Sequence, residues 1–232
     1  MKTIGLLGGM SWESTIPYYR IINEVVKARL GGLHSAKIVL HSVDFYEIEQ
    51  LQHETQWEEA GRVLAEAAAS LEHAGAELVV LCTNTMHKVA PAIERALSIP
   101  FLHIADPTAE AIKKAGISTV GLLGTKFTME EDFYVERLRK KHGLHVLVPD
   151  ESDRQTIHGV IYDELCLGQI VDSSRKEYYR IISRLTSQGA HGIILGCTEI
   201  SLLVNPGHVA VPTFDTTSLH AEYAAFHALG GA

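Results

Sequence analysis

The sequence repeats one series of motifs, and this internal repeat constrains the fold more than any other feature. Three pairs of segments match in the same order, at offsets that stay between 112 and 116 residues. The pairs are IGLLGGMSWEST from Ile4 with VGLLGTKFTMEE from Val120, ELVVLCTNT from Glu77 with HGIILGCTE from His191, and IPFLHIADPTAEA from Ile99 with VPTFDTTSLHAEY from Val211. Because three ordered matches at nearly constant spacing are improbable by chance, the repeat predicts two halves built to the same plan.

Short apolar runs alternate with longer amphipathic stretches along the chain. The runs are rich in Val, Ile and Leu without polar alternation, a pattern typical of parallel strands covered on both faces. One amphipathic stretch, residues 56–75, ends at a glycine, as helices commonly do. The expected strands are residues 3–8, 37–42, 77–81, 100–104, 119–123, 145–148, 191–195 and 211–214. The pattern predicts an α/β fold with right-handed βαβ crossovers.

The repeat and the strand pattern together predict two lobes related by a pseudo-twofold axis. We expect residues 1–104, with a returning strand and helix from residues 211–232, to form the first lobe and residues 105–210 the second. In open α/β sheets, ligands bind beyond the carboxyl ends of the strands. The motifs TNT and CTE follow two matching strands, so the duplication can aim both at one cleft from opposite sides.

Composition narrows the class of protein. A net charge of −8 gives no support to nucleic-acid or anionic-membrane partners. The three cysteines are an odd number without a CxxC motif, and the 13 histidines are scattered, so neither a disulfide framework nor a metal site is expected. The first apolar stretch is too short and glycine-rich for a signal peptide. We expect a cytoplasmic protein with a small-molecule substrate.

The facing motifs suit one type of chemistry. Racemisation needs one proton-transfer group on each wall of a cleft, because one group removes the Cα proton and the other delivers a proton to the opposite face. A thiol is suitable, since its reference pKa of about 8.5 is close to neutrality and neighbours or a helix N-terminus can lower it. Cys197 and Thr83 occupy matching positions of the repeat.

The motifs GLLGGMSWEST, TNTMH, IYDELCLG and GCTEI resemble, in order and spacing, the aspartate/glutamate racemase family over almost the whole chain. The resemblance is to its bacterial broad-specificity or acidic amino-acid branch. It implies two flavodoxin-like lobes with the active site in the cleft between them, a two-base mechanism without cofactor, and a homodimer. GLLGG lacks the glycine spacing of a dinucleotide-binding loop, and no lysine stands in a context suggesting a pyridoxal phosphate Schiff base.

The sequence departs from the family pattern at the first catalytic position. The family form is Cys-Asn-Thr, whereas Thr83 precedes the asparagine here and Cys82 comes one residue earlier. A shift of one residue turns a strand side chain to the other face, so we expect Cys82 to pack beneath the cleft. A hydroxyl is a much poorer base than a thiol. We therefore predict unequal half-reactions, with Cys197 serving the faster enantiomer.

The resemblance also implies substrate contacts. Some family members carry a lysine at the position of Cys166; its absence weakens strict aspartate specificity, and we expect Cys166 to be a core cysteine on a helix face. His87 is interpreted as a structural histidine. Gln52 is interpreted either as a substrate contact or as a solvated helix end, and Glu199 could receive the substrate ammonium. The expected substrate-binding residues are Met10, Ser11, Gln52, Asn84, Thr85, Thr125, Thr198 and Glu199.

Two other functions stay open. Isomerases and decarboxylases of the superfamily also use cleft cysteines on carboxylate substrates, and Cys197 could protonate a single face without inversion. A chain with only one cysteine at the paired positions could also be a non-catalytic module that binds an acidic amino acid.

Overall fold

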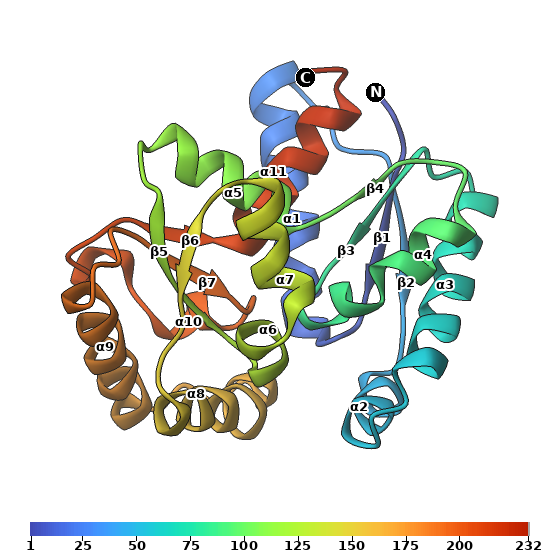
Figure 1. The fold of residues 1–232 in the computed structure, drawn as a ribbon. Helices are drawn as coiled ribbons and strands as arrows, with labels where there is room; N and C mark the ends of the chain where they lie inside the picture. Colours follow the sequence, from blue (N-terminus) through green and yellow to red (C-terminus); the bar gives the residue numbers. More distant parts are fainter. Residues whose placement is uncertain (232) are drawn as a thin grey trace. The chain divides into compact units, whose positions relative to one another are not determined.

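The computed structural model describes residues 1–231, whose strands form two four-stranded parallel sheets (Figure 1). The strand orders are β2-β1-β3-β4 and β6-β5-β7-β8, so the two sheets have the same topology. Each predicted strand is present within a few residues of its expected ends. The predicted α/β class with two similar lobes is confirmed.

The chain divides into two compact units, one of residues 1–104 with 220–232 and one of residues 105–219. The first unit contains β1 (Ile4–Gly8), α1 (Trp12–Leu30), β2 (Ile38–Ser42), α2 (Phe45–His53), α3 (Trp57–His73), β3 (Leu78–Leu81), the 3₁₀ helix η1 (Thr85–Val89), α4 (Ala90–Ala96), β4 (Phe101–Leu102) and most of α11 (Thr216–Ala228). The second contains α5 (Ala105–Lys114), β5 (Thr119–Gly124), α6 (Lys126–Glu130), α7 (Asp132–Glu136), the π-helix η2 (Arg137–Lys141), β6 (His145–Leu147), α8 (Glu151–Asp163), the 3₁₀ helix η3 (Leu165–Leu167), α9 (Asp172–Ser187), β7 (Ile193–Gly196), α10 (Ile200–Leu203), the 3₁₀ helix η4 (Pro206–His208) and β8 (Thr213–Asp215).

The predicted place of the last strand is wrong. Residues 211–219 do not return to the first lobe, because β8 pairs in parallel with β7 and completes the second sheet. The repeat explains this pairing. β8 is the counterpart of β4, and each is the edge strand of the sheet in its own half. Of the C-terminal segment predicted to return to the first lobe, only the part from His220 onward belongs to the first unit.

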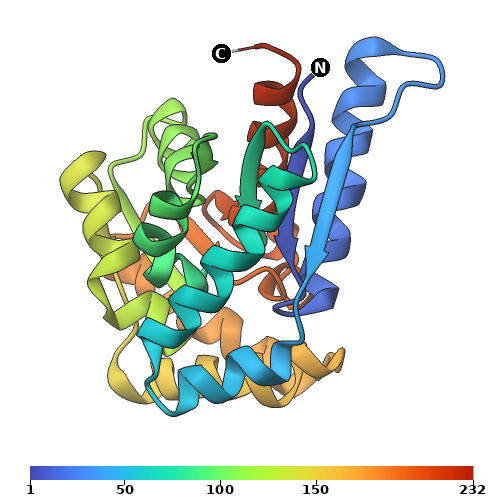
Figure 2. The same cartoon turned by 90° about the vertical axis from the view of Figure 1, so that its right-hand side faces the viewer.

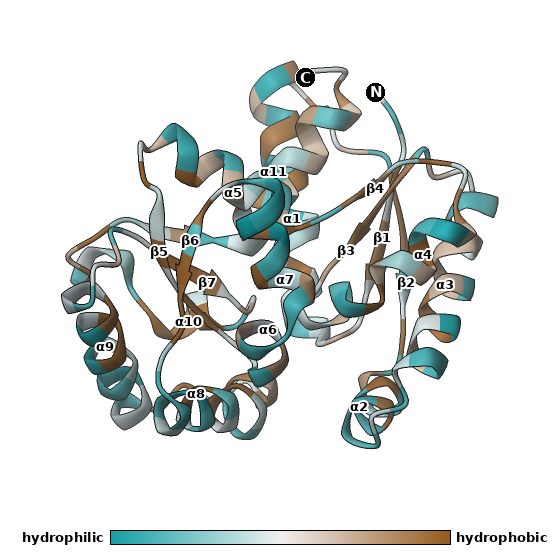
Figure 3. Cartoon of the chain, viewed as in Figure 1, coloured by the Kyte–Doolittle hydropathy of each residue, from teal (hydrophilic) through white to brown (hydrophobic). Residues whose placement is uncertain are grey.

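The central strands β1 and β3 of the first sheet are buried on both faces (Figures 2 and 3). Leu6, Val80 and Cys82 pack on the side of α1 and α11, whereas Val79 and Leu81 pack on the side of α3. Figure 2 shows α1 and α3 on opposite sides of this sheet, and Figure 3 shows brown strands beneath helices with teal outer surfaces. The alternation of side chains along β3 thus decides which residue enters the core at the carboxyl end of the strand.

No helix within residues 1–231 is both long enough and apolar enough to cross a membrane.

Candidate active site

The first unit carries its candidate site residues just beyond β1 and β3. The turn after β1 depends on Gly9, which has a φ of +96°, and a Cβ there would lie 2.3 Å from the Val43 carbonyl oxygen. Ser11 then caps α1, with its side chain accepting from the Ser14 amide. The Ser14 hydroxyl bonds the Ser11 carbonyl at 2.7 Å and contacts the Cys82 carbonyl at 3.3 Å. These bonds tie the loops after β1 and β3 together, with Met10 and Ser11 both buried.

Cys82 lies in the hydrophobic core, as the alternation of the strand predicted. It packs with Tyr18 and Ile22 of α1 and is 0% exposed. Burial raises the pKa of the Cys82 thiol far above its ordinary value, which keeps the thiol neutral. Thr83 follows it and is 8% exposed. The two residues therefore differ in environment although they are adjacent in the chain.

His87 fixes the backbone at Thr83. Its Nδ1 donates to the Thr83 carbonyl oxygen at 2.7 Å, and its Nε2 accepts from the Ile104 amide at 3.2 Å. The ring is 1% exposed, and this pair of bonds requires the neutral tautomer with hydrogen on Nδ1. The expected structural role of His87 is confirmed, and this role is to hold the carbonyl of the candidate catalytic threonine.

Gln52 is not a solvated helix end. It is buried at the end of α2, and its Nε2 donates to the sulfur of Met86 at 2.9 Å. Met86 belongs to η1, directly after Asn84 and Thr85, which are also buried. Gln52 thus lies beside the segment that follows β3.

The second unit places Thr125 as the counterpart of Ser11. The Thr125 side chain caps α6 by accepting from the Thr128 amide at 3.3 Å, and the residue is buried beyond the end of β5. Its hydroxyl oxygen also lies 3.2 Å from the Thr128 hydroxyl. Both halves thus begin the helix after their central strand with a hydroxyl cap.

Glu199 gathers three donors beyond the end of β7. Its Oε2 accepts from the Cys197 thiol at 2.9 Å and from the Thr198 hydroxyl at 2.5 Å. Its Oε1 accepts a longer contact, 3.8 Å, from the thiol of Cys166. All three contacts point hydrogen atoms at the carboxylate, so they fit an ionised glutamate and two protonated thiols.

The pKa of Cys197 is raised, whereas the sequence suggested that neighbours or a helix N-terminus could lower it. Burial raises the pKa of this thiol well above its usual range, and the negative charge of Glu199 raises it further. The helix that follows, α10, begins at Ile200 and spans only four residues, so its dipole offers little compensation. Cys197 therefore rests as a proton donor and becomes a base only after losing its proton.

Cys166 is not the core cysteine on a helix face that the sequence suggested. It lies in η3, after α8 has ended, and is only partly buried. The left-handed residue Gly168, with a φ of +71°, closes this turn and directs the thiol to Glu199. The contact depends on the end of α8 at Asp163, because Cys166 lies in the separate turn η3 that follows.

Sequence reasoning missed Tyr178. Its hydroxyl donates to the Ile157 carbonyl at 3.1 Å. Burial is the main cause that raises the pKa of Tyr178, and the nearby acidic groups Cys197 and Glu164 raise it further, so Tyr178 lies near the same cluster. Nothing in the sequence distinguishes this tyrosine from others in amphipathic helices. Within residues 1–231, no group of three His, Cys, Asp or Glu side chains could hold a metal ion.

Comparison with known proteins defines the class. The profile of the Asp/Glu/hydantoin racemase family matches residues 7–224, so the chain belongs to this family of racemases. It is 24% identical to the broad specificity amino-acid racemase RacX of Bacillus subtilis (strain 168), over 94% of this chain and 95% of that protein.

Solved structures agree with this family. A candidate Asp/Glu racemase from Yersinia pestis is 61% identical, with a TM-score of 0.92 over 99% of this chain and 100% of that chain. An aspartate racemase homologue from Pyrococcus horikoshii OT3 is 35% identical, with a TM-score of 0.84 over 99% and 100% of the two chains.

Proposed function

We propose that the protein racemises an acidic amino acid without a cofactor, by two-base proton transfer at Cα, with Cys197 and Thr83 serving opposite faces. One observation carries the proposal. In the parallel registers, Thr83 is the second residue after Leu81, which pairs with Leu7, and Cys197 is the second after Leu195, which pairs with Leu123. Matching positions of a duplicated fold thus hold a hydroxyl and a thiol.

Proton transfer on the thiol side runs through Glu199. The Cys197 thiol gives its proton to the Glu199 carboxylate, to which it is already hydrogen-bonded, and the resulting thiolate takes the Cα proton of the substrate. In the reverse direction the neutral thiol protonates the planar carbanion and recovers a proton from Glu199. The buried Thr198 hydroxyl, bonded to the same Oε2, holds the carboxylate in place.

Thr83 makes the second face slower. If its hydroxyl resembles water, with a pKa of roughly 15, it is about 6 units above a thiol, or on the order of 9 kcal/mol poorer as a base. Thr83 can donate or relay a proton to the carbanion but rarely removes one. The enantiomer whose Cα–H faces Cys197 is therefore the better substrate.

The substrate class rests on the family and on the polar groups around the strand ends. Related proteins include an aspartate racemase from Picrophilus torridus and a glutamate racemase from Roseiflexus sp. (strain RS-1). Ser11 after β1, Asn84 and Thr85 after β3, and Gln52 at the end of α2 are all buried and offer hydroxyl and amide groups that suit carboxylates. A cysteine at position 166, where some relatives have a lysine, favours a substrate range wider than aspartate alone.

Exchange of the α-proton tests the proposal directly. Each enantiomer of aspartate and glutamate is incubated with the enzyme in D₂O, and loss of the α-proton signal is followed by NMR. One enantiomer should exchange far faster than the other. Equal rates would contradict the roles given to Thr83 and Cys197.

The two alternative functions give other results in the same experiment. A carboxylate isomerase or decarboxylase would leave every amino acid unexchanged, and a binding module would bind an acidic amino acid without any exchange. Loss of optical rotation by a panel of L-amino acids provides an independent measurement.

The proposal includes a homodimer formed through α1 and β2. Arg20 and Glu24 form a loose pair on α1, both more than half exposed, so this face carries charges of both signs and two copies would not repel each other. Apolar side chains on this face are exposed and line a shallow groove: Trp12, Ile16, Tyr19 and Leu40. Light scattering after size-exclusion chromatography measures the association.

A further inference from the structure

The Glu199 carboxylate is shared by two cysteines from different parts of the chain. Cys197 stands two residues before it, whereas Cys166 belongs to η3, 33 residues away. The proposed proton transfer uses Cys197 and Glu199 only. Cys166 is therefore a partly exposed thiol, bonded to the same carboxylate, that the mechanism leaves without a role.

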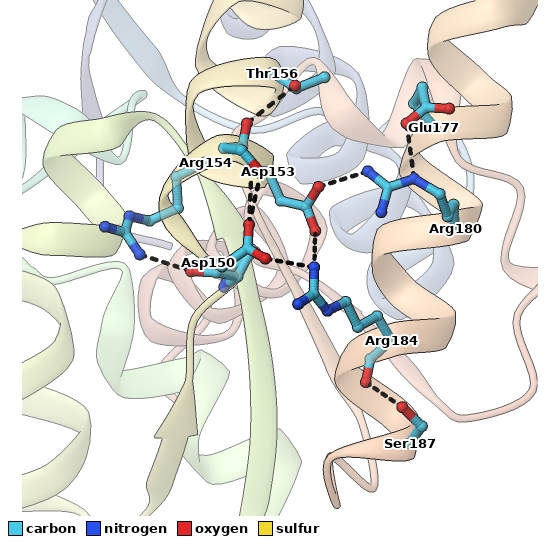
Figure 4. A network of polar contacts seen from close by, with 10 residues as sticks. Asp150, Asp153, Arg154, Thr156, Glu177, Arg180, Arg184 and Ser187 are labelled. Atoms are coloured by element: carbon cyan, nitrogen blue, oxygen red, sulfur yellow. Dashed lines mark hydrogen bonds and ion pairs between the residues drawn. The ribbon is translucent and has the colours of Figure 1, made fainter.

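The two helices that flank the turn carrying Cys166 are tied together at two places. Figure 4 shows the carboxylate of Asp153, in the first turn of α8, bonded to Arg180 and Arg184 of α9, and Asp153 is 4% exposed. At the other end of α8, beside the turn, the Ser174 hydroxyl donates to Glu164 Oε1 at 2.8 Å. The second bond restrains the turn directly, whereas the first fixes α8 against α9.

We propose that Cys166 is a positioning residue for Cys197: its thiol holds Oε1 of Glu199 and, through that carboxylate, sets how readily Cys197 gives up its proton. The inference rests on the proposed function, in which Cys197 is the base. A thiol hydrogen directed at a carboxylate stabilises its negative charge, so Glu199 accepts the proton of Cys197 less readily. Cys166 itself also raises the pKa of Cys197. Without Cys166, the Cys197 thiolate forms at lower pH.

The ionisable groups near Cys197 come from the packed elements of this unit. Glu199 on its own segment and Cys166 on η3 both raise the pKa of Cys197. Tyr178 on α9 interacts with Cys197 and with Glu164, which follows α8. The buried tyrosine stays neutral far above neutral pH, because burial raises its pKa. Glu199 and Cys166 are thus the neighbours whose change alters Cys197 most.

Two substitutions at position 166 distinguish the effect of the hydrogen bond from the effect of losing the thiol side chain. Cys166→Ala removes the donor, and Cys166→Ser keeps a hydroxyl donor of similar size; both remove the second thiol. Leu167→Ala is the matched control, because this side chain is exposed and lies in the same turn. The pH dependence of Cys197 alkylation by iodoacetamide is measured by peptide mass spectrometry under single-label conditions.

The expected order is specific. The alkylation midpoint of Cys197 should fall by about half a pH unit in Cys166→Ala, since a thiol donor is weak and only part of its effect reaches Cys197. Cys166→Ser should return the midpoint toward the parent value or above it. At neutral pH, α-proton exchange of the fast enantiomer should rise about threefold in the alanine variant and return toward the parent rate in the serine variant.

Equal midpoints in the alanine and serine variants would overturn the inference, and so would a higher midpoint in the alanine variant. The alkylation measurement does not depend on catalysis. If the parent exchanged no amino acid, the proposed function would fail while the alkylation midpoints still decided the role of Cys166.

Discussion

Replacing Thr83 by cysteine is the most direct perturbation of the proposed pair. Thr83 and Cys197 have the same exposed fraction, 8%, at matching positions of the two units. A thiol is about 6 pKa units more acidic than a water-like hydroxyl, which sets an upper limit on the order of 9 kcal/mol for the gain in the slow half-reaction. Burial lowers this gain, because it raises the pKa of a thiol here as it does at Cys197.

The expected result is a large and one-sided change. A positioned acid–base group typically contributes about 10²–10⁴-fold to a rate, so α-proton exchange of the slow enantiomer should rise by roughly 10²-fold or more in Thr83→Cys. Exchange of the fast enantiomer should change only slightly, because Cys197 and Glu199 are unaltered. The assay is α-proton exchange in D₂O for both enantiomers of aspartate and glutamate.

Two variants control this experiment. Thr85→Cys adds a thiol at a second buried threonine, two residues further along the chain. Thr83→Ser retains the hydroxyl and should keep the difference between the enantiomers. The reasoning is refuted if the slow enantiomer exchanges no faster in Thr83→Cys, or if Thr85→Cys accelerates it equally.

Further predictions concern the thiols and the apolar face. Cys197→Ser should lower α-proton exchange of the fast enantiomer by about 10²-fold or more while calorimetry still detects binding of the amino acid; unchanged exchange would exclude Cys197 as the base. Cys82→Ala should lower the free energy of unfolding in urea by about 1 kcal/mol, through a small core cavity, without altering exchange. The raised pKa values of Cys82 and Cys197 mean that the unfolded thiols ionise first, so stability should be full below about pH 8.5 and fall above it by up to about 1.4 kcal/mol per pH unit for each thiol. In urea titrations at increasing pH, Cys82→Ala should show a shallower loss. Ile16→Glu should halve the mass of the particle in light scattering, whereas a parent protein that is already monomeric would contradict the proposed interface.

The sequence predicted those features that depend on local pattern. Apolar runs without alternation located the strands, and the period of two in β3 placed Cys82 in the core. Three features depend on contacts that no local pattern encodes. The pairing of β8 with β7 and the turn that brings Cys166 to Glu199 join segments far apart in the chain. The raised pKa of Cys197 depends first on its burial, which the whole unit provides. The sequence suggested the residue types of the site but not their protonation.

The two units also explain why the cysteine of the first half is displaced by one residue. The position before the reactive residue is Cys82 in the first unit and Gly196 in the second. At Gly196 an added Cβ would lie 2.8 Å from the Leu122 side chain and from the Leu123 carbonyl oxygen, so the second unit has no room for a side chain there. At Cys82 the equivalent space exists and the thiol fills it within the core. Cys82 therefore acts as packing, and at the matching positions of the repeat the first unit has a hydroxyl at residue 83 where the second has a thiol at residue 197.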